Sequence, residues 1–115
     1  MIMFAKANRL KKTADFKKIF RSGKFVRGEA IEARFMPNDL DVCRFGFITG
    51  LSVSKKATIR NKIRRRLSEA ARTLVPSIGN NFDILIVAKA KIIGKSGEEI
   101  LKDVQNIFKK AGIRS

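Results

Sequence analysis

The densest group of chemically capable side chains is a run of cations in the middle of the chain. Residues 60–66 read RNKIRRR, and their cations are Arg60, Lys62, Arg64, Arg65 and Arg66. Guanidinium groups stay charged and present a planar fork of donors that matches phosphate oxygens. Asn61 adds an amide that suits a base edge, a ribose hydroxyl or a phosphate. The run therefore predicts a surface that binds phosphate groups.

An apolar stripe predicts that these cations lie on a helix over residues 58–75. The stripe recurs at the three- and four-residue spacing of one helix face and consists of Ile59, Ile63, Leu67, Ala70 and Leu74. Thr58 is the expected N-cap, and Pro76 and Gly79 are the expected stop signals. The stripe is expected to pack on the domain and to leave the cations facing outward.

The cations of this helix surround the stripe. Arg60 and Arg64 flank it on one side, at 3.6 residues per turn. Lys62 and Arg66 flank it on the other side. Charge runs on helices are usually solvated faces that acids four residues away stabilise, but Glu69 is the only acid in the predicted helix. Because the like charges repel one another, we favour a phosphate partner over a solvated face.

Positive charge dominates the composition of the whole chain. Its 115 residues include 26 Lys and Arg but 10 Asp and Glu, which gives a formal net charge of +16. Such a surplus repels itself in a compact state unless a polyanion neutralises it. The candidates are nucleic acid and an anionic membrane surface, and no apolar run approaches the ~18 residues of a membrane span. With a hydrophobic fraction of 44%, residues 1–115 are predicted to form one nucleic-acid-binding domain.

Residues suited to protein-borne catalysis are scarce. The chain has no histidine, which removes the commonest general base and metal ligand. Cys43 therefore lacks an imidazole partner and is expected to be a small apolar residue. Asp39 and Asp41 are interpreted as residues of a loop over 37–41, because no further acid is expected to converge on them. We predict no catalytic residue and no metal site on the protein itself.

Two features indicate a cytoplasmic protein. Residues 1–4 are apolar, but a signal peptide has roughly 7–15 apolar residues after a basic start. Cys43 is the only cysteine, so no internal disulfide can form, as is usual in a reducing compartment.

The first half of the chain predicts one helix and three strands. The helix spans residues 13–21, with Thr13 as its N-cap and Asp15 near the positive end of its dipole. One face of it carries Phe16, Ile19 and Phe20, and Gly23 is its stop signal. The strands are expected over residues 24–27, 30–36 and 44–49.

The second half predicts a buried strand and a closing helix. Residues 82–88 read FDILIVA, a nearly continuous apolar run that suits a strand buried on both faces. The helix spans residues 96–110, with Ser96 and Glu99 as a capping box and Gly112 past its end. Its apolar face consists of Ile100, Val104, Ile107 and Phe108. The order of elements predicts an α/β sandwich with a small sheet.

Short motifs of a known kind follow one another along the chain. Residues 8–12 read NRLKK and precede Asp15-Phe16 and Ile19-Phe20. Residues 44–47 read RFGF, and residues 52–56 read SVSKK. Arg60-Asn61-Lys62 is followed by Ile63-Arg64-Arg65. This ordered set resembles the bacterial ribonuclease P protein family, whose signature is Arg-Asn-Arg. Lys62 keeps the charge of the third position, and Gly50-Leu51 stands where relatives tend to have Ser or Lys.

The resemblance implies a fold and a task. The implied fold is a two-layer sandwich with a mixed four-stranded sheet, similar to the second domain of ribosomal protein S5. A left-handed crossover joins its two parallel strands, against the usual right-handed preference. The implied task is to bind a catalytic RNA subunit and the 5′ leader of precursor tRNA, and so to assist removal of the leader. The implied cofactor is Mg²⁺, bound mainly by the RNA subunit and substrate, and no protein partner or membrane is implied.

The resemblance also implies two surfaces. The surface for the RNA subunit comprises Arg60, Asn61, Lys62, Arg64, Arg65, Arg66, Lys55 and Lys56. The leader cleft, between the first helix and the sheet, comprises Phe16, Phe20, Lys17, Arg9, Lys12, Arg34 and Phe47. Aromatic faces suit single strands because every base has a stackable surface. A plain core role is the alternative for Phe16 and Phe20, and Arg34 stands where relatives can carry an aromatic residue.

Three other functions fit parts of the sequence. A generic structured-RNA-binding protein of the ribosomal type shares the charge and size but not the two surfaces. A protein-only nuclease needs clustered acids or histidine. A DNA-binding domain would place the helix over residues 58–75 in a groove and favour duplex DNA over structured RNA.

Overall fold

The computed structural model describes residues 9–40, 42–75 and 82–112 of the chain. Within them, the predicted order of elements is confirmed. The elements are α1 (Thr13–Ser22), β1 (Lys24–Arg27), β2 (Ile31–Pro37), β3 (Arg44–Ile48), α2 (Ala57–Leu74), β4 (Phe82–Ala88), the 3₁₀ helix Ala90–Ile92 and α3 (Gly97–Ala111). None of the helices described is long and apolar enough to cross a membrane.

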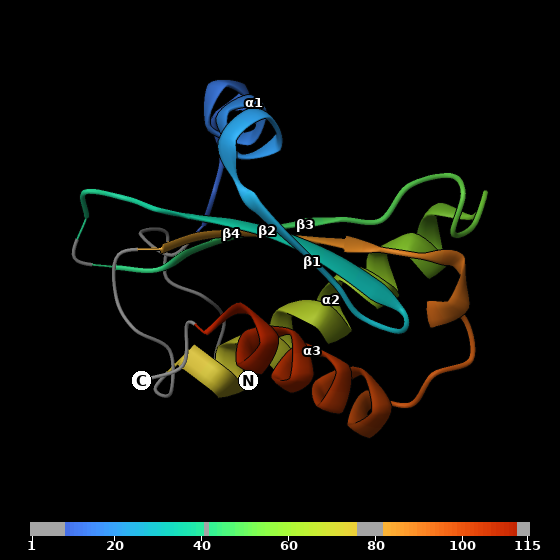
Figure 1. The fold of residues 1–115 in the computed structure, drawn as a ribbon. Helices are drawn as coiled ribbons and strands as arrows, with labels where there is room; N and C mark the ends of the chain where they lie inside the picture. The colour runs from blue at the N-terminus through green and yellow to red at the C-terminus, as the bar shows by residue number, and fades with distance from the viewer. Residues whose placement is uncertain (1–8, 41, 76–81, 113–115) are drawn as a thin grey trace.

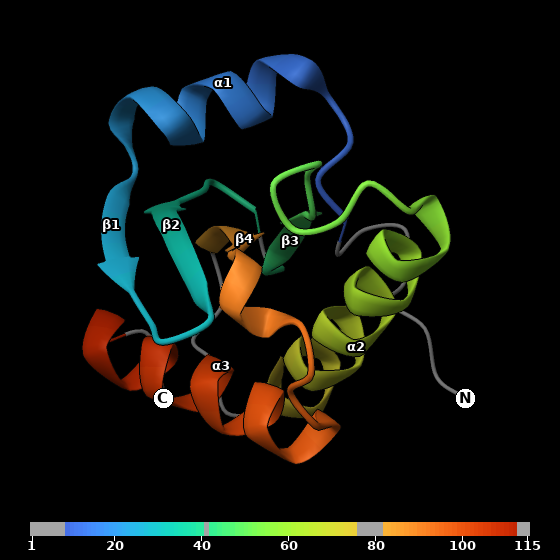
Figure 2. The same cartoon turned by 90° about the vertical axis from the view of Figure 1, so that its right-hand side faces the viewer.

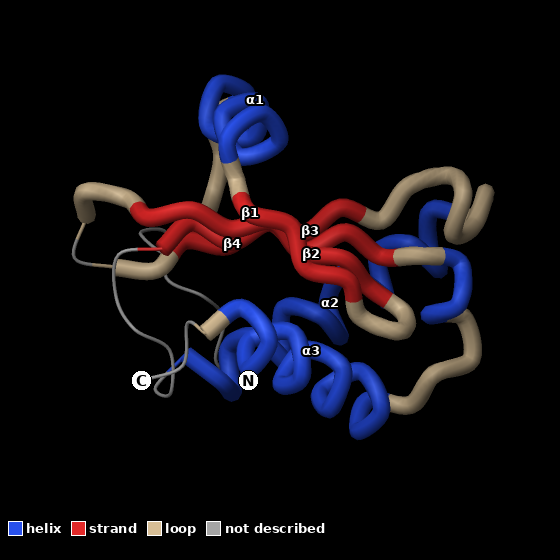
Figure 3. Tube along the Cα trace, in the orientation of Figure 1, coloured by secondary structure: helices blue, strands red, loops and turns tan. Residues whose placement is uncertain are grey.

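The four strands form one mixed sheet in the order β1-β2-β4-β3. β2 is antiparallel to both β1 and β4, whereas β3 and β4 are parallel. α1 covers one face of the sheet, and α2 and α3 cover the other (Figures 1 and 3). In Figure 2 the parallel strands β3 and β4 run toward the viewer, α2 lies below the sheet, and β4 lies to the left of β3. The crossover through α2 is therefore left-handed, as the family resemblance implied.

β4 is the strand around which both layers pack. Ile84 and Ile86 are buried in the core beneath α2 and α3. Leu85 points to the other face, where it packs with Ile19 of α1 and Leu10. Side chains alternate between the faces of a strand, so burial of three successive residues requires cover on both sides. The prediction of a doubly buried strand is confirmed.

The helix boundaries confirm some of the predicted caps and correct others. Ser96 and Glu99 form the capping box of α3, and Gly112 ends that helix in the left-handed region at φ 70°. The N-cap predictions for Thr13 and Thr58 are wrong. Lys12 and Lys56 occupy the N-cap positions, with extended backbone and no side-chain cap. The stop signals predicted at Pro76 and Gly79, together with Asn8 and Asp41, lie outside the described residues.

An ion pair between a buried aspartate and a partly exposed arginine fixes the start of β3 against β4. The Arg44 guanidinium donates to both carboxylate oxygens of Asp83, from Nε at 2.8 Å and from Nη2 at 2.6 Å. A third guanidinium nitrogen lies 3.4 Å from Asp15 of α1. The Asn38 amide donates to Asp83 at 2.8 Å. The hydrogen bonds to Asp83 raise the pKa of Arg44 above its ordinary value, and the Arg44 contacts link β3 to both β4 and α1.

Candidate nucleic-acid interface

The cations of α2 lie around its buried stripe, as the sequence predicts. Ile63, Leu67 and Ala70 are buried against the sheet and α3, and Ile59 and Leu74 pack partly buried beside them. Among the residues described, none of the five cations in residues 60–66 forms a salt bridge with an acid. Glu69 is engaged instead by Arg72, 2.6 Å away. The positive charge of α2 is therefore open to an outside partner.

Short polar contacts hold several of these cations in place. The Arg60 guanidinium donates to the backbone carbonyl of Ser54 at 2.9 Å, which ties α2 to the loop before it. Arg64 donates to the Asn61 side chain. Lys55 and Lys56, exposed in that loop, lead into the helix. The residues of the predicted surface for the RNA subunit thus run from the loop along both flanks of α2.

A groove of about 460 Å³ runs along the edge of β3. We call it the β3-edge groove. Six residues of the two predicted surfaces line it, namely Arg9, Phe16, Phe47, Asn61, Arg64 and Arg65. The rest of its lining is Leu10, Phe45, Gly46 and Ser68. The fold therefore brings part of the predicted leader cleft and part of the predicted RNA-subunit surface into one site.

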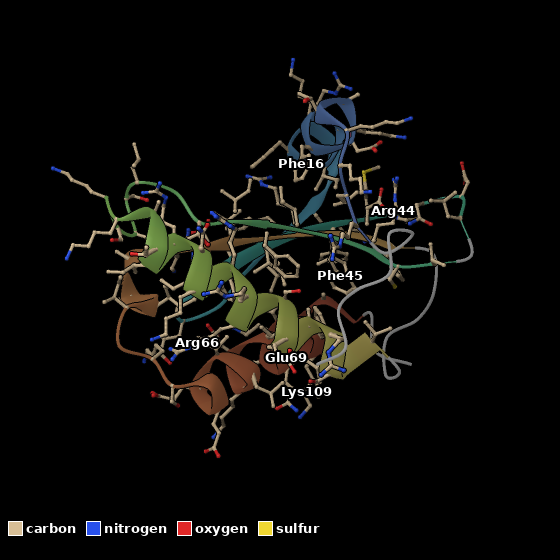
Figure 4. The ribbon with its side chains drawn as sticks, turned by 180° about the vertical axis from the view of Figure 1, so that it is seen from behind. Phe16, Arg44, Phe45, Arg66, Glu69 and Lys109 are labelled. Carbon is tan, nitrogen blue, oxygen red and sulfur yellow. The ribbon has the colours of Figure 1, made fainter. Side chains whose placement is uncertain are left out.

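Two backbone features shape this groove. The Leu10 N–H donates to the carbonyl of Phe45 at 2.9 Å, so the segment before α1 pairs with the edge of β3. The ring of Phe16 lies directly on Gly46, where an added Cβ would come within 2.7 Å of the ring. Glycine is thus required for the close approach of α1 to the sheet. Figure 4 shows Phe16 between α1 and the sheet, with Phe45 on the opposite side toward α2.

Phe47 reaches the groove from the unexpected side of the sheet. Its ring stacks parallel to that of Phe45, with centroids 6.2 Å apart, and it packs against the core under α2 and α3. The prediction that placed Phe47 in a cleft beneath α1 is therefore wrong about the face. Phe47 still lines the groove because β3 is the edge strand and leaves its ring accessible there.

A second aromatic cluster contains two further residues of the predicted cleft, Phe20 and Arg34. The Arg34 guanidinium lies 5.6 Å from the ring centroid of Phe20 and 5.1 Å from that of Phe25. Phe20 is 46% exposed, which argues against a plain core role for it. Phe25 was not among the site residues predicted from the sequence. Its signal in the sequence was an aromatic residue in the short strand predicted over residues 24–27. We call these three residues the Phe20–Arg34 cluster.

The predicted leader-cleft residues therefore divide between places. Arg9, Phe16 and Phe47 line the β3-edge groove, whereas Phe20 and Arg34 belong to the other cluster. Lys12 and Lys17 are exposed at the start of α1 and line neither. The aromatic residues that were predicted to line one cleft therefore lie in two places, the β3-edge groove and the Phe20–Arg34 cluster.

Cys43 is buried in the core. Burial raises the pKa of its thiol, so the neutral form is favoured. The prediction of a small apolar residue at this position is confirmed.

Comparison with known proteins decides the family. The family model described as Ribonuclease P matches residues 4–112. The chain belongs to this family. A ribonuclease P protein component from Syntrophomonas wolfei is 36% identical over 111 residues, which cover 96% of this chain and 92% of that protein. One from Fusobacterium nucleatum is 38% identical over 111 residues, with 92% and 98% covered.

Solved structures of ribonuclease P proteins share the fold. The protein from Staphylococcus aureus superposes with a TM-score of 0.86 at 26% identity, over 96% of this chain and all of that one (100%). The protein from Thermotoga maritima superposes with a TM-score of 0.81 at 28% identity, over 89% of this chain and 96% of that one. The ribonuclease P sandwich, including its mixed sheet, is thus the fold of this chain.

Proposed function

We propose that this chain is the protein subunit of ribonuclease P. In this role it binds the catalytic RNA subunit and the 5′ leader of precursor tRNA, and it assists endonucleolytic removal of the leader. The observation that carries the proposal is the β3-edge groove. Arg64 and Arg65 of α2 line it together with Phe16 of α1 and Arg9, so one site combines cations for phosphates with an aromatic face for a base.

The residue types suggest which side chains bind the RNA subunit and which bind the leader. Arg60, Arg64 and Arg65 neutralise phosphates of the RNA subunit as charge-assisted hydrogen-bond donors. The exposed ring of Phe20 and the partly exposed ring of Phe16 offer stacking surfaces along α1 for a single strand. The leader is then held on the protein while the RNA subunit contacts the rest of the substrate.

We place the bond-breaking chemistry on the RNA. The polar residues that line the β3-edge groove are arginines, an asparagine and a serine. Carboxylate oxygens, which Mg²⁺ prefers, are missing from that set, so the groove does not fit a magnesium site. Mg²⁺ held by the RNA subunit and substrate would supply the activated water. The protein's own contribution is to bind, orient and neutralise.

Salt dependence of binding to the RNA subunit tests this function. We expect the Kd for a bacterial ribonuclease P RNA to rise steeply with salt. Arg65→Ala should reduce the magnitude of the log–log slope by about one unit, because one phosphate contact is lost. Filter binding at several salt concentrations measures both quantities.

Lys109→Ala is the matched control for that experiment. Lys109 is exposed on α3, on the far side of the core from α1 (Figure 4), so its loss removes one charge outside the groove. A wild-type slope for Arg65→Ala, or equal changes in both variants, would show that Arg65 is only a solvated charge. Duplex DNA that competes as well as the RNA would favour the DNA-binding alternative.

A further inference from the structure

The opposite flank of α2 lines a second pocket, of about 400 Å³. Ile59, Lys62 and Arg66 of α2 form one wall, and residues 92–96 form the other. We call it the Ile93 pocket. None of its lining residues lines the β3-edge groove. On a helix of 3.6 residues per turn, Lys62 and Arg66 lie on the other side of the buried stripe from Arg64.

The Ile93 pocket combines an exposed apolar side chain with an anchored cation. Ile93 is 49% exposed, in contrast to its buried neighbour Ile92. Gly94 follows at φ 86°, a left-handed conformation that glycine adopts without strain. The Arg66 guanidinium donates to the carbonyl of Lys95 at 3.2 Å, so one cation of α2 is anchored on this turn. An exposed isoleucine thus stands beside a positioned guanidinium.

The charges around the pocket favour an anion on the α2 side. The Lys95 ammonium lies 3.2 Å from Glu29 and 3.7 Å from Glu99, a group with a net charge of −1, but neither carboxylate is among the residues that line the pocket. Lys62 and Arg66 have no acidic partner among the residues described. The remaining charge facing the pocket is therefore positive, next to the apolar surface of Ile59 and Ile93.

We propose that the Ile93 pocket binds one unpaired nucleotide of the ribonuclease P RNA subunit. The base lies on Ile59 and Ile93, and its phosphate is bound by Lys62 and Arg66. Proteins recognise unpaired RNA bases that leave the stack by holding a face of the base on an aromatic ring or a guanidinium plane, and in this pocket the apolar surface of Ile59 and Ile93 takes that place. Because the β3-edge groove occupies the other flank, α2 would lie between two separate segments of RNA. This inference rests on the proposed function.

Tethered cleavage on the assembled complex tests whether the two flanks meet different RNA segments. An iron–EDTA reagent is attached to Ile93→Cys in one protein and to Ser68→Cys, in the β3-edge groove, in another. The native Cys43 is buried, so protein without an added thiol gives the background. We expect each probe to cleave its own segment of the RNA subunit. One shared segment, or no cleavage from Ile93→Cys, overturns the proposal.

A charge substitution measures the contribution of the pocket. Ile93→Asp should weaken binding of the RNA subunit about tenfold or more, because it replaces the apolar surface under the base with a carboxylate that repels the RNA backbone. Leu40→Asp introduces the same charge at an exposed leucine in the loop before β3. This variant should leave binding near wild type. Thermal melting of both variants checks that they fold.

The outcomes separate this inference from the proposed function. If wild-type protein binds the ribonuclease P RNA no better than an unrelated RNA of equal length, the proposed function fails. If wild-type binding is selective and Ile93→Asp binds equally well, only the Ile93 pocket is wrong.

Discussion

Replacing Arg44 with methionine is expected to lower the free energy of unfolding by about 3 kcal/mol. Removing one partner of a buried ion pair typically costs about 3–5 kcal/mol, because the other charge stays buried without its partner. The lower end applies because the Arg44 side chain is 21% exposed, whereas that of Asp83 is 8% exposed. Urea denaturation monitored by circular dichroism measures the loss.

Arg27→Met is the matched control for this prediction. Arg27 lies 3.9 Å from Glu32 and its side chain is 70% exposed, so its loss should change stability by less than about 1 kcal/mol. Adding Asp83→Leu to Arg44→Met should restore part of the stability, because no charge is then left buried. Equal effects of Arg44→Met and Arg27→Met would contradict the structural role of the buried pair.

Phe20→Leu is expected to weaken binding of precursor tRNA to the assembled ribonuclease P by one to two decades. Stacking of a base on an aromatic ring contributes about 1–3 kcal/mol, and each 1.4 kcal/mol is about tenfold in affinity. Leucine keeps the apolar contact of Phe20 but removes its flat face. Mature tRNA lacks the leader, so its binding should change little. Parallel titrations with both RNAs measure the ratio.

Phe16→Leu separates stacking from packing. Phe16 packs against the cluster of Leu10, Ile19 and Leu85 and lies on Gly46, so this variant should lose thermal stability as well as leader selectivity. The control is Phe82→Leu, at the start of β4, where the ring packs edge-on to Phe35. It should keep the wild-type ratio of precursor to mature binding. If Phe20→Leu also keeps that ratio, the stacking role of Phe20 is wrong.

Periodicity in the sequence predicted the elements well where burial is one-sided or complete. The run over residues 82–88 matches β4 residue for residue, and the stripe through Ile63 and Leu67 is the buried face of α2. These patterns are reliable because burial of apolar surface is the main source of stability. The N-cap errors at Thr13 and Thr58 are local. Both threonines lie inside the first turn, after a lysine whose backbone is extended.

Contacts that depend on how the strands pair, including those that shape the candidate site, could not be predicted from sequence patterns. The parallel register that sets Arg44 opposite Asp83 joins residues 39 positions apart. A lone acid in the apolar run over residues 82–88 was the only signal for that pair. Strand order likewise makes β3 an edge strand, and this exposes Phe47 to the groove from the face opposite α1. Periodicity does not specify strand order.

Cleavage of precursor tRNA in a reconstituted reaction tests the central claim most directly. Turnover is measured at low Mg²⁺ with the protein alone, with a bacterial ribonuclease P RNA alone, and with both together. We predict no cleavage by the protein alone, slow cleavage by the RNA alone, and a clear increase when the two are combined. The product should carry the mature 5′ end of the tRNA. Robust cleavage by the protein without RNA, or no increase over the RNA alone, would contradict the account.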